Sequence, residues 1–153
     1  MSSLGFSKDN YSRCKNSAVY SLAMREHSRQ ELKVKLTQKG FSTDVDLNKL
    51  LDELESNDYL NDQRFAESFI RSRVIRGQGK IKILNDLKQR GVSPLIISTT
   101  MKKSDTNWNV LAREIREKKF GRVIPVDYKE KTKQMRFLSS RGFDSEEINQ
   151  TLK

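Results

Sequence analysis

The chain contains one cysteine, Cys14, and therefore cannot form a disulfide within itself. It contains no apolar run of membrane-spanning length, and its polar opening stretch lacks the apolar segment of a signal peptide. A lone thiol suits a reducing compartment. These absences exclude a disulfide-stabilised secreted domain and a membrane-spanning protein, and we expect a cytoplasmic protein.

Histidine is equally scarce. His27 is the only one, which excludes histidine-based metal clusters and most catalytic triads. In its turn before Ser28 we expect it at the surface or beside a helix cap. Cys14 lies in a polar stretch with nothing nearby to activate its thiol. The sequence therefore predicts no catalytic residues.

Two other stretches resemble binding motifs without meeting their requirements. Gly77-Gln78-Gly79-Lys80 lacks the longer spacing of a P-loop and follows no predicted strand, so a helix–helix turn is the better interpretation. Six acidic residues between Asp44 and Asp58 are better interpreted as a solvated helix face than as a metal site. We expect neither a cofactor nor a metal.

What the chain does have is charge. It is 35% hydrophobic and 33% charged, so its core must be thin, and an elongated shape is favoured. The net charge of +10 is concentrated. Residues 15–60 have a net charge of −1, residues 61–104 of +7 and residues 105–153 of +3. Such a field attracts nucleic acid, an anionic membrane or an acidic protein surface.

A short phrase recurs three times: LTQKGF at 36–41, LKQRGV at 87–92 and LSSRGF at 138–143. Its glycines, Gly40, Gly91 and Gly142, are separated by 51 and 51 residues. Glycine adopts the left-handed conformation that follows many helices, and the apolar residue after it packs back on the last turn. Each phrase therefore predicts a helix end.

Helix start signals agree with these ends. Ser28 with Glu31 forms a capping box, Ser93 precedes Pro94 at a first helical position, and Asp127 and Asp144 begin similar phrases. Apolar residues with helical spacing precede and follow each glycine-terminated helix. The predicted unit is helix, helix, glycine turn, helix.

The fold class is therefore all-α, with three tandem three-helix repeats forming an elongated, curved array. We place the repeats at 15–58, 59–104 and 105–153, after a flexible N-terminal tail, 1–14. The third repeat carries an insertion at 121–126. The alternative is a nine-helix globule in which the glycine caps coincide by chance.

The repeated pattern resembles the RecX family, the small regulators of the bacterial RecA recombinase. In the first repeat the resemblance rests on residues 22–28, 31–32 and 36 (LAMREHS, EL and L). In the second it rests on 59–62 (YLND), 64–66 (RFA), 69–70 (FI), Arg73, Gly77, Gly79, Ile83, Leu87 and Gly91. Asn61 departs from the aspartate that is frequent in the family, but either residue caps a helix. The third repeat matches least well.

The resemblance implies a protein of tandem three-helix repeats without enzymatic activity. It implies binding along the groove of the RecA–DNA filament, across adjacent protomers, with inhibition of RecA's ATP hydrolysis, strand exchange and coprotease activity. Contact with single- or double-stranded DNA would be electrostatic, and the protein is expected to be a monomer.

Charge and position, rather than the resemblance, select the candidate contact residues. One basic face is usually only solvated, but three at equivalent points of stacked repeats would form a stripe for a polyanion. The candidates are Arg25, Arg29, Lys33, Arg71, Arg73, Arg76, Lys80 and Lys82. Further basic residues are placed similarly in the third repeat: Lys118, Lys119, Arg122, Lys129, Lys131 and Lys133.

Two other functions remain open. A stand-alone DNA-binding protein of helix-turn-helix-like units would read bases with the third helix of each unit. The corresponding segments 46–56 and 94–103 are acidic and apolar, respectively, which disfavours that function. An RNA-binding array would be distinguished by a preference for RNA over DNA.

Overall fold

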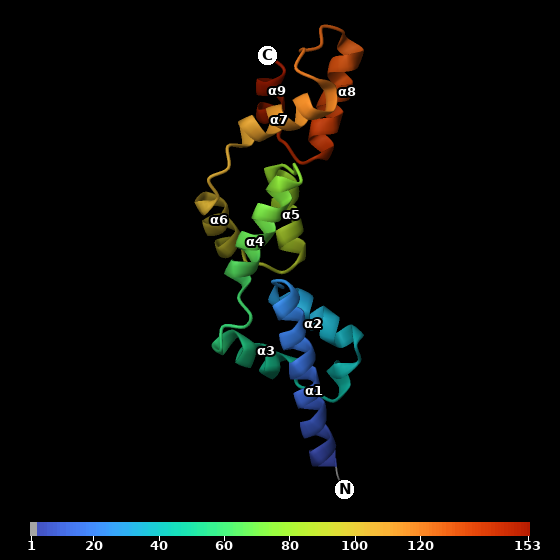
Figure 1. The fold of residues 1–153 in the computed structure, drawn as a ribbon, viewed down its shortest axis with the longest axis vertical. Helices are drawn as coiled ribbons and strands as arrows, with labels where there is room; N and C mark the ends of the chain where they lie inside the picture. Colours follow the sequence, from blue (N-terminus) through green and yellow to red (C-terminus); the bar gives the residue numbers. More distant parts are fainter. Residues whose placement is uncertain (1–2) are drawn as a thin grey trace.

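The protein is an array of helices (Figure 1). The computed structural model describes residues 3–153, with side chains from Asp9 onward. Within that range there is no strand, which confirms the all-α prediction. The nine helices described there and one 3₁₀ turn are α1 (Ser3–Met24), α2 (Arg29–Gln38), η1 (Phe41–Thr43), α3 (Leu47–Ser56), α4 (Asp62–Ile75), α5 (Lys80–Gln89), α6 (Pro94–Lys103), α7 (Trp108–Phe120), α8 (Tyr128–Ser140) and α9 (Ser145–Thr151).

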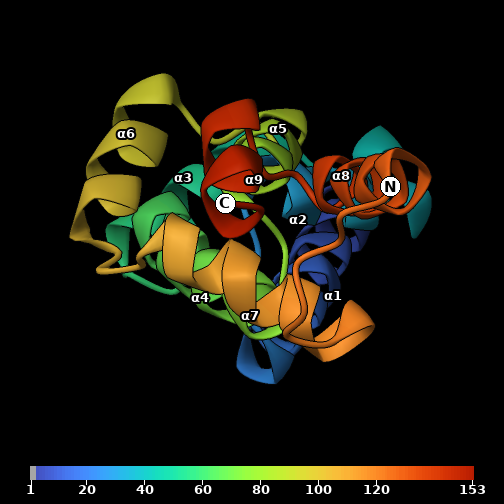
Figure 2. The ribbon, with the colours of Figure 1, turned by 90° about the horizontal axis from the view of Figure 1, so that it is seen from above.

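The helices form three groups, each around its own apolar cluster. Unit 1 (α1–α3) buries Leu32, Leu50 and neighbours, unit 2 (α4–α6) buries Ile83 and Leu87 among others, and unit 3 (α7–α9) is centred on Leu138. Figure 1 shows the units following one another along the long axis of the molecule. In the view along that axis their ribbons overlap (Figure 2). The predicted elongated repeat fold is therefore confirmed.

Helix ends follow the sequence signals. Gly40, Gly91 and Gly142 have φ angles of 88°, 78° and 99°, as predicted for left-handed caps. Val92 donates its N–H to the Leu87 carbonyl, and the equivalent residue after Gly142 bonds to the end of α8 in the same way. Capping boxes begin α2 and α9, and side-chain caps begin α6 and α8, all at the predicted residues.

The N-terminal segment is more ordered than its sequence suggested. We predicted a flexible tail over 1–14, but α1 is helical from Ser3 onward. Cys14 is fully buried in the core of unit 1, and Tyr11 donates a hydrogen bond to Glu53 (2.9 Å). The sequence did not reveal this order because the segment is mostly polar and Glu53, the partner of Tyr11, lies 42 residues farther along the chain.

Successive units are joined at matching positions. Between units 1 and 2, Ser28 Oγ donates to the Arg90 carbonyl (2.7 Å). Between units 2 and 3, the Gly79 N–H donates to the Arg141 carbonyl (2.7 Å). Donors and acceptors are each 51 residues apart, the spacing of the glycine turns. Units 1 and 2 thus each place the start of their second helix against the glycine turn of the next unit. The loop that precedes that helix therefore lies at the junction.

Candidate polyanion-binding surface

Four arginines converge on a hollow of about 220 Å³ at the junction of units 1 and 2. Arg25 follows α1, Arg73 and Arg76 lie at the end of α4, and Arg90 follows α5. The first three were candidates from the sequence. Arg90 was not a candidate because it belongs to the phrase LKQRGV, which was interpreted only as a helix end.

Phe69 organises two of these arginines. The guanidinium of Arg73 lies 4.4 Å from the centre of the Phe69 ring, and that of Arg90 lies 4.9 Å from it. Both arrangements are cation–π contacts. Burial lowers the pKa of Arg73, and the nearby charge of Arg90 lowers it further. Arginine nevertheless remains charged in proteins, so the site keeps two adjacent cations.

Carboxylates offset part of this charge. Glu31 pairs with Arg90 (3.2 Å) and with Arg25 (3.4 Å), while Arg73 pairs with Asp86 (3.3 Å). Arg76 is exposed and forms no salt bridge among the described residues. The hollow therefore combines arginines held in place by acids with one whose guanidinium is available to an anion.

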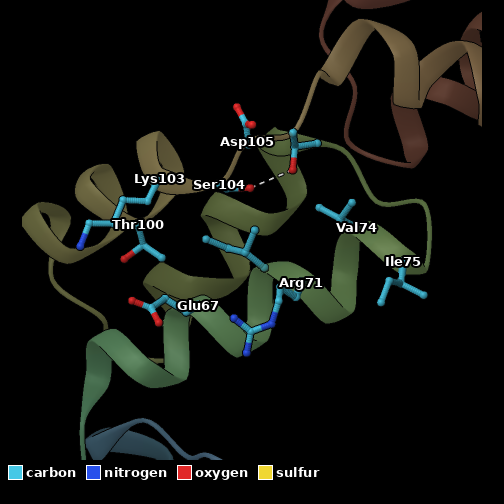
Figure 3. Close-up of a pocket in the computed structure, with 10 residues that line it drawn as sticks. Glu67, Arg71, Val74, Ile75, Thr100, Lys103, Ser104 and Asp105 are labelled. Atoms are coloured by element: carbon cyan, nitrogen blue, oxygen red, sulfur yellow. Dashed lines mark hydrogen bonds between the residues drawn. The ribbon is translucent and has the colours of Figure 1, made fainter.

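Arg71 lies outside this hollow, on a groove of about 510 Å³ between α4 and α6. Figure 3 shows Glu67 and Arg71 on α4 and Thr100 and Lys103 on α6 among the residues that line it. Ile75, also in the lining, is 85% exposed. The groove is mainly apolar with charged groups around it, unlike the arginine hollow.

The two candidates on α2 differ in their surroundings. Arg29 is engaged within unit 1, where it pairs with Asp52 (2.8 Å) and with Glu55. Those hydrogen bonds raise its pKa against the opposing effect of burial. Lys33 is exposed and forms no salt bridge among the described residues. Arg29 thus holds α2 against α3, and Lys33 remains free to contact a ligand.

Lys80 and Lys82 lie at the junction of units 2 and 3. Lys80 is half-buried in a hollow that also contains Asp105, Asp144 and two glutamates. The stem of Lys82 lies close to Gly142, while the residue as a whole is exposed. The candidates are therefore distributed over several hollows and helix faces.

Unit 3 has exposed basic residues and no salt bridge among the described residues. Its one fully buried cation is Arg116, which contacts only neutral acceptors. The exposed residues predicted from the sequence are Lys118, Lys119, Arg122, Lys129, Lys131 and Lys133.

The residues considered for catalysis occupy structural positions. His27 is buried rather than at the surface, its ring contacts the Arg25 carbonyl (3.0 Å), and burial lowers its pKa. Of the two expected positions, the one beside a helix cap is confirmed, since His27 directly precedes the N-cap Ser28. The surface position was wrong because the junction of units 1 and 2 covers this turn. Burial raises the pKa of Cys14 to about 11, which disfavours the reactive thiolate.

The acidic residues of unit 1 have structural partners as well. Asp46 caps α3, Glu53 pairs with Lys15 (3.4 Å), and two others pair with Arg29. Across the described residues, no group of three or more histidine, cysteine or acidic side chains is arranged to hold a metal ion. None of the helices described combines the length and apolar character needed to span a membrane.

Comparisons with known proteins agree with the repeat. Family models for the first, second and third three-helix domains of RecX match residues 14–45, 61–101 and 110–152. The regulatory protein RecX of Halorhodospira halophila is 38% identical over 134 residues, which cover 88% of this chain and 83% of that protein. The RecX protein of Legionella pneumophila is 41% identical over 138 residues, or 90% of this chain and 91% of its own.

Solved structures show the same architecture. The crystal structure of RecX from Lactobacillus salivarius matches with a TM-score of 0.77 and 21% identity, covering 95% of this chain and 96% of that one. A second crystal structure, of a regulatory protein RecX, gives a TM-score of 0.75 with 18% identity, covering 93% of this chain and 72% of that one. At these identities the likeness concerns the fold.

Proposed function

The chain belongs to the RecX family of regulatory proteins, and we propose that it binds the RecA nucleoprotein filament along its groove and inhibits RecA. The inhibited activities are ATP hydrolysis, strand exchange and the coprotease function, through which the protein modulates recombination and DNA repair. It acts by binding, as a cytoplasmic monomer without catalysis of its own.

The convergence of Arg25, Arg73, Arg76 and Arg90 at the junction of units 1 and 2 carries this proposal. A guanidinium binds a phosphate or a carboxylate through two parallel hydrogen bonds, so such a cluster recognises DNA backbone and acidic protein groups alike. A nucleoprotein filament offers both. Cation–π contacts and salt bridges orient two of the arginines in advance, which lowers the entropy lost on binding.

The elongated shape supports the same function. A ligand that extends along a filament meets several units of the array at once, and weak contacts made together give a strong total affinity. Arg71 and Arg76 are exposed residues of α4 and its C-cap, near the middle of the array. We assign most of the electrostatic attraction to this middle part.

The test compares two charge reversals of equal size. Arg71→Glu with Arg76→Glu alters one residue of the groove between α4 and α6 and one of the arginine hollow, whereas Lys49→Glu with Lys88→Glu alters exposed residues that line neither. All four side chains are exposed, so helix content should be unchanged. RecA's DNA-dependent ATP hydrolysis is measured against inhibitor concentration at two ionic strengths. The first variant should inhibit less, with a weaker salt dependence, because fewer ionic contacts remain.

Equal inhibition by both variants and the parent would show that the middle basic surface is not the contact. If the parent does not inhibit RecA, the proposed regulatory activity is wrong. Site-selective DNA binding in its place would then indicate a stand-alone DNA-binding protein, and a preference for RNA would indicate an RNA-binding array. Asp52 and Glu55 on α3, both paired with Arg29, disfavour a base-reading role for that helix.

A further inference from the structure

The loop between α7 and α8 lies at the end of the molecule that is opposite the N-terminus (Figure 1). Three large apolar side chains in this stretch of the sequence are almost fully exposed. They belong to the loop between α7 and α8 and to the first residue of α8. Val123 is 82% exposed, Val126 99% and Tyr128 83%. We name these three residues the apolar prong. Such a cluster usually marks a site of interaction.

The buried side chain of Arg116 holds this loop in place. It is 1% exposed, and its guanidinium donates to the carbonyls of Gly121 (3.4 Å), Arg122 (3.5 Å) and Val123 (3.4 Å). The same group donates to Thr151 Oγ1 (3.0 Å) in α9 and to the side chain of Gln134 in α8. The loop backbone is therefore fixed to all three helices of unit 3.

This arrangement costs free energy that a loop with only a connecting role would not require. Burial of a cation without a carboxylate partner is unfavourable, and each carbonyl that Arg116 binds belongs to the loop of the prong. Four residues, 25–28 and 76–79, connect the equivalent helices in units 1 and 2, whereas residues 121–127 do so in unit 3. The longer loop is not required for connecting helices, and its rigidity presents apolar side chains to a partner without a large loss of entropy.

Cations flank the prong in sequence. Lys118, Arg122 and Lys129 are exposed and form no salt bridges among the described residues. Lys119 is directed elsewhere, with its ammonium 5.4 Å from the centre of the Phe137 ring. The carboxylate of Asp127, between Val126 and Tyr128, accepts the Glu130 N–H as the cap of α8. An apolar tip flanked by the first three cations, which we name the collar, complements an apolar pocket rimmed by carboxylates. Two of the three side chains are valines, which have no aromatic face for stacking on bases and leave only Tyr128 with one, so the chemistry favours a protein pocket over nucleic acid.

A second copy of this chain is a less suitable partner for the prong. The two internal junctions connect units through backbone carbonyls at glycine turns, with Ser28 and Gly79 as donors. The glycine turn of unit 1, at Gly40, takes part in neither junction. It contains exposed Lys39, which has the same positive charge as the collar and would repel it. The prong offers apolar side chains in place of the hydrogen-bond donors that such a turn requires.

We infer that the apolar prong inserts into an apolar, acid-rimmed pocket on a protomer of the filament, as an anchor separate from the arginine hollow. This inference rests on the proposed function, because it takes the filament as the partner. It gives unit 3 a role in protein recognition, while the middle of the array supplies the ionic contacts.

The experiment uses a triple variant, Val123→Ser, Val126→Ser and Tyr128→Ser. Its matched control, Tyr20→Ser, Val34→Ser and Leu95→Ser, removes one tyrosine and two aliphatic side chains that are also exposed, in units 1 and 2. Affinity is measured for RecA filaments assembled on single-stranded DNA and for the same DNA without RecA. The prong variant should bind filaments roughly tenfold more weakly or worse, because apolar anchors dominate interface energies. Its affinity for DNA alone and the slope of filament affinity against salt should not change.

Each contrary result is distinct. Equal filament affinity of the prong variant and the control overturns the prong and leaves the regulatory function intact. A parallel loss of affinity for DNA alone shows that the prong contacts nucleic acid and also overturns the inference. Concentration-dependent dimerisation of the parent that disappears in the variant, seen by sedimentation, identifies a second copy as the occupant instead. If the parent fails to bind filaments at all, the proposed function fails and the prong inference fails with it.

Discussion

Units 2 and 3 contain similar numbers of basic residues, ten and eleven, but use them differently. In unit 2, Arg64, Arg73 and Arg90 form salt bridges, two of them to acids of unit 1. Among the described residues of unit 3 no cation does so, and most are exposed on the surfaces of α7 and α8. Unit 2 concentrates charge at a junction, whereas unit 3 distributes it around an apolar loop.

One pair of arginines shows the difference most clearly. Arg73 and Arg116 each lie near the end of the first helix of their unit, and each contacts the loop that follows. Arg73 has a carboxylate partner in Asp86 and lies over an aromatic ring. Arg116 has only neutral acceptors. The same residue type near the same helix end thus lines the arginine hollow in one unit and holds a loop in the other.

The largest effect is expected from Arg116→Ala. It removes the hydrogen bonds that hold the loop and leaves a cavity among α7, α8 and α9, so the free energy of unfolding should fall by about 2–4 kcal/mol. Denaturant unfolding followed by circular dichroism measures this. Arg113→Ala on the exposed face of α7 is the control and should stay within about 0.5 kcal/mol of the parent. Matching midpoints for the two variants would show that Arg116 does not hold unit 3 together.

The junction between the two units is probed by Gly79→Ala. Gly79 has a φ of −83°, which alanine tolerates, but its Cβ would lie 2.4 Å from the carbonyl group of Gly142. We expect a loss of roughly 1–3 kcal/mol, through separation of units 2 and 3. Hydrogen exchange of the Ile81 amide, which donates to the Gly142 carbonyl (3.0 Å), should accelerate.

Gly40→Ala provides the control for this junction. Gly40 has a φ of 88° and no atom near its Cβ position, so the substitution should cost about 1 kcal/mol from strain alone. It should leave exchange at Ile81 as it is in the parent. Unchanged exchange in Gly79→Ala as well would mean that units 2 and 3 do not depend on this close approach.

The sequence predicted those parts of the fold that depend on local chemistry. Gly91 and Gly142 end helices because only glycine adopts their backbone without strain, and Ser28 starts one because its hydroxyl accepts a backbone N–H. The ordered start of α1 escaped prediction because Tyr11 bonds to Glu53, 42 residues along the chain, and Cys14 is buried only when the core of unit 1 forms. Local signals give helix ends, and distant contacts decide whether a polar segment is ordered.

The candidate surface was predictable in composition but not in arrangement. Arg25, Arg73 and Arg76 come together at the hollow. Arg29 was selected by the same charge criterion, but it pairs with acids of its own unit. Arg90 was overlooked because the phrase that contains it, LKQRGV, was interpreted only as a helix end. Which charges face a ligand depends on how side chains pair across units, and counting charges along the sequence does not reveal this pairing.

The smallest effect tests whether convergence or mere exposure decides which charges bind. Arg71→Gln with Arg76→Gln removes two cations of the middle unit, and Lys129→Gln with Lys133→Gln removes two exposed cations of α8. Binding to single-stranded DNA is titrated at several salt concentrations. Each lost phosphate contact reduces the magnitude of the negative slope of log affinity against log salt by about 0.7. The middle variant should lose about 1.4 from this slope and the α8 variant clearly less, since Arg76 lies beside three further arginines, whereas Lys129 and Lys133 line a hollow that also contains Asp127 and Glu130. An equal loss in both variants would show that exposed charge binds DNA wherever it lies, and the proposed division of roles between units 2 and 3 would then be wrong.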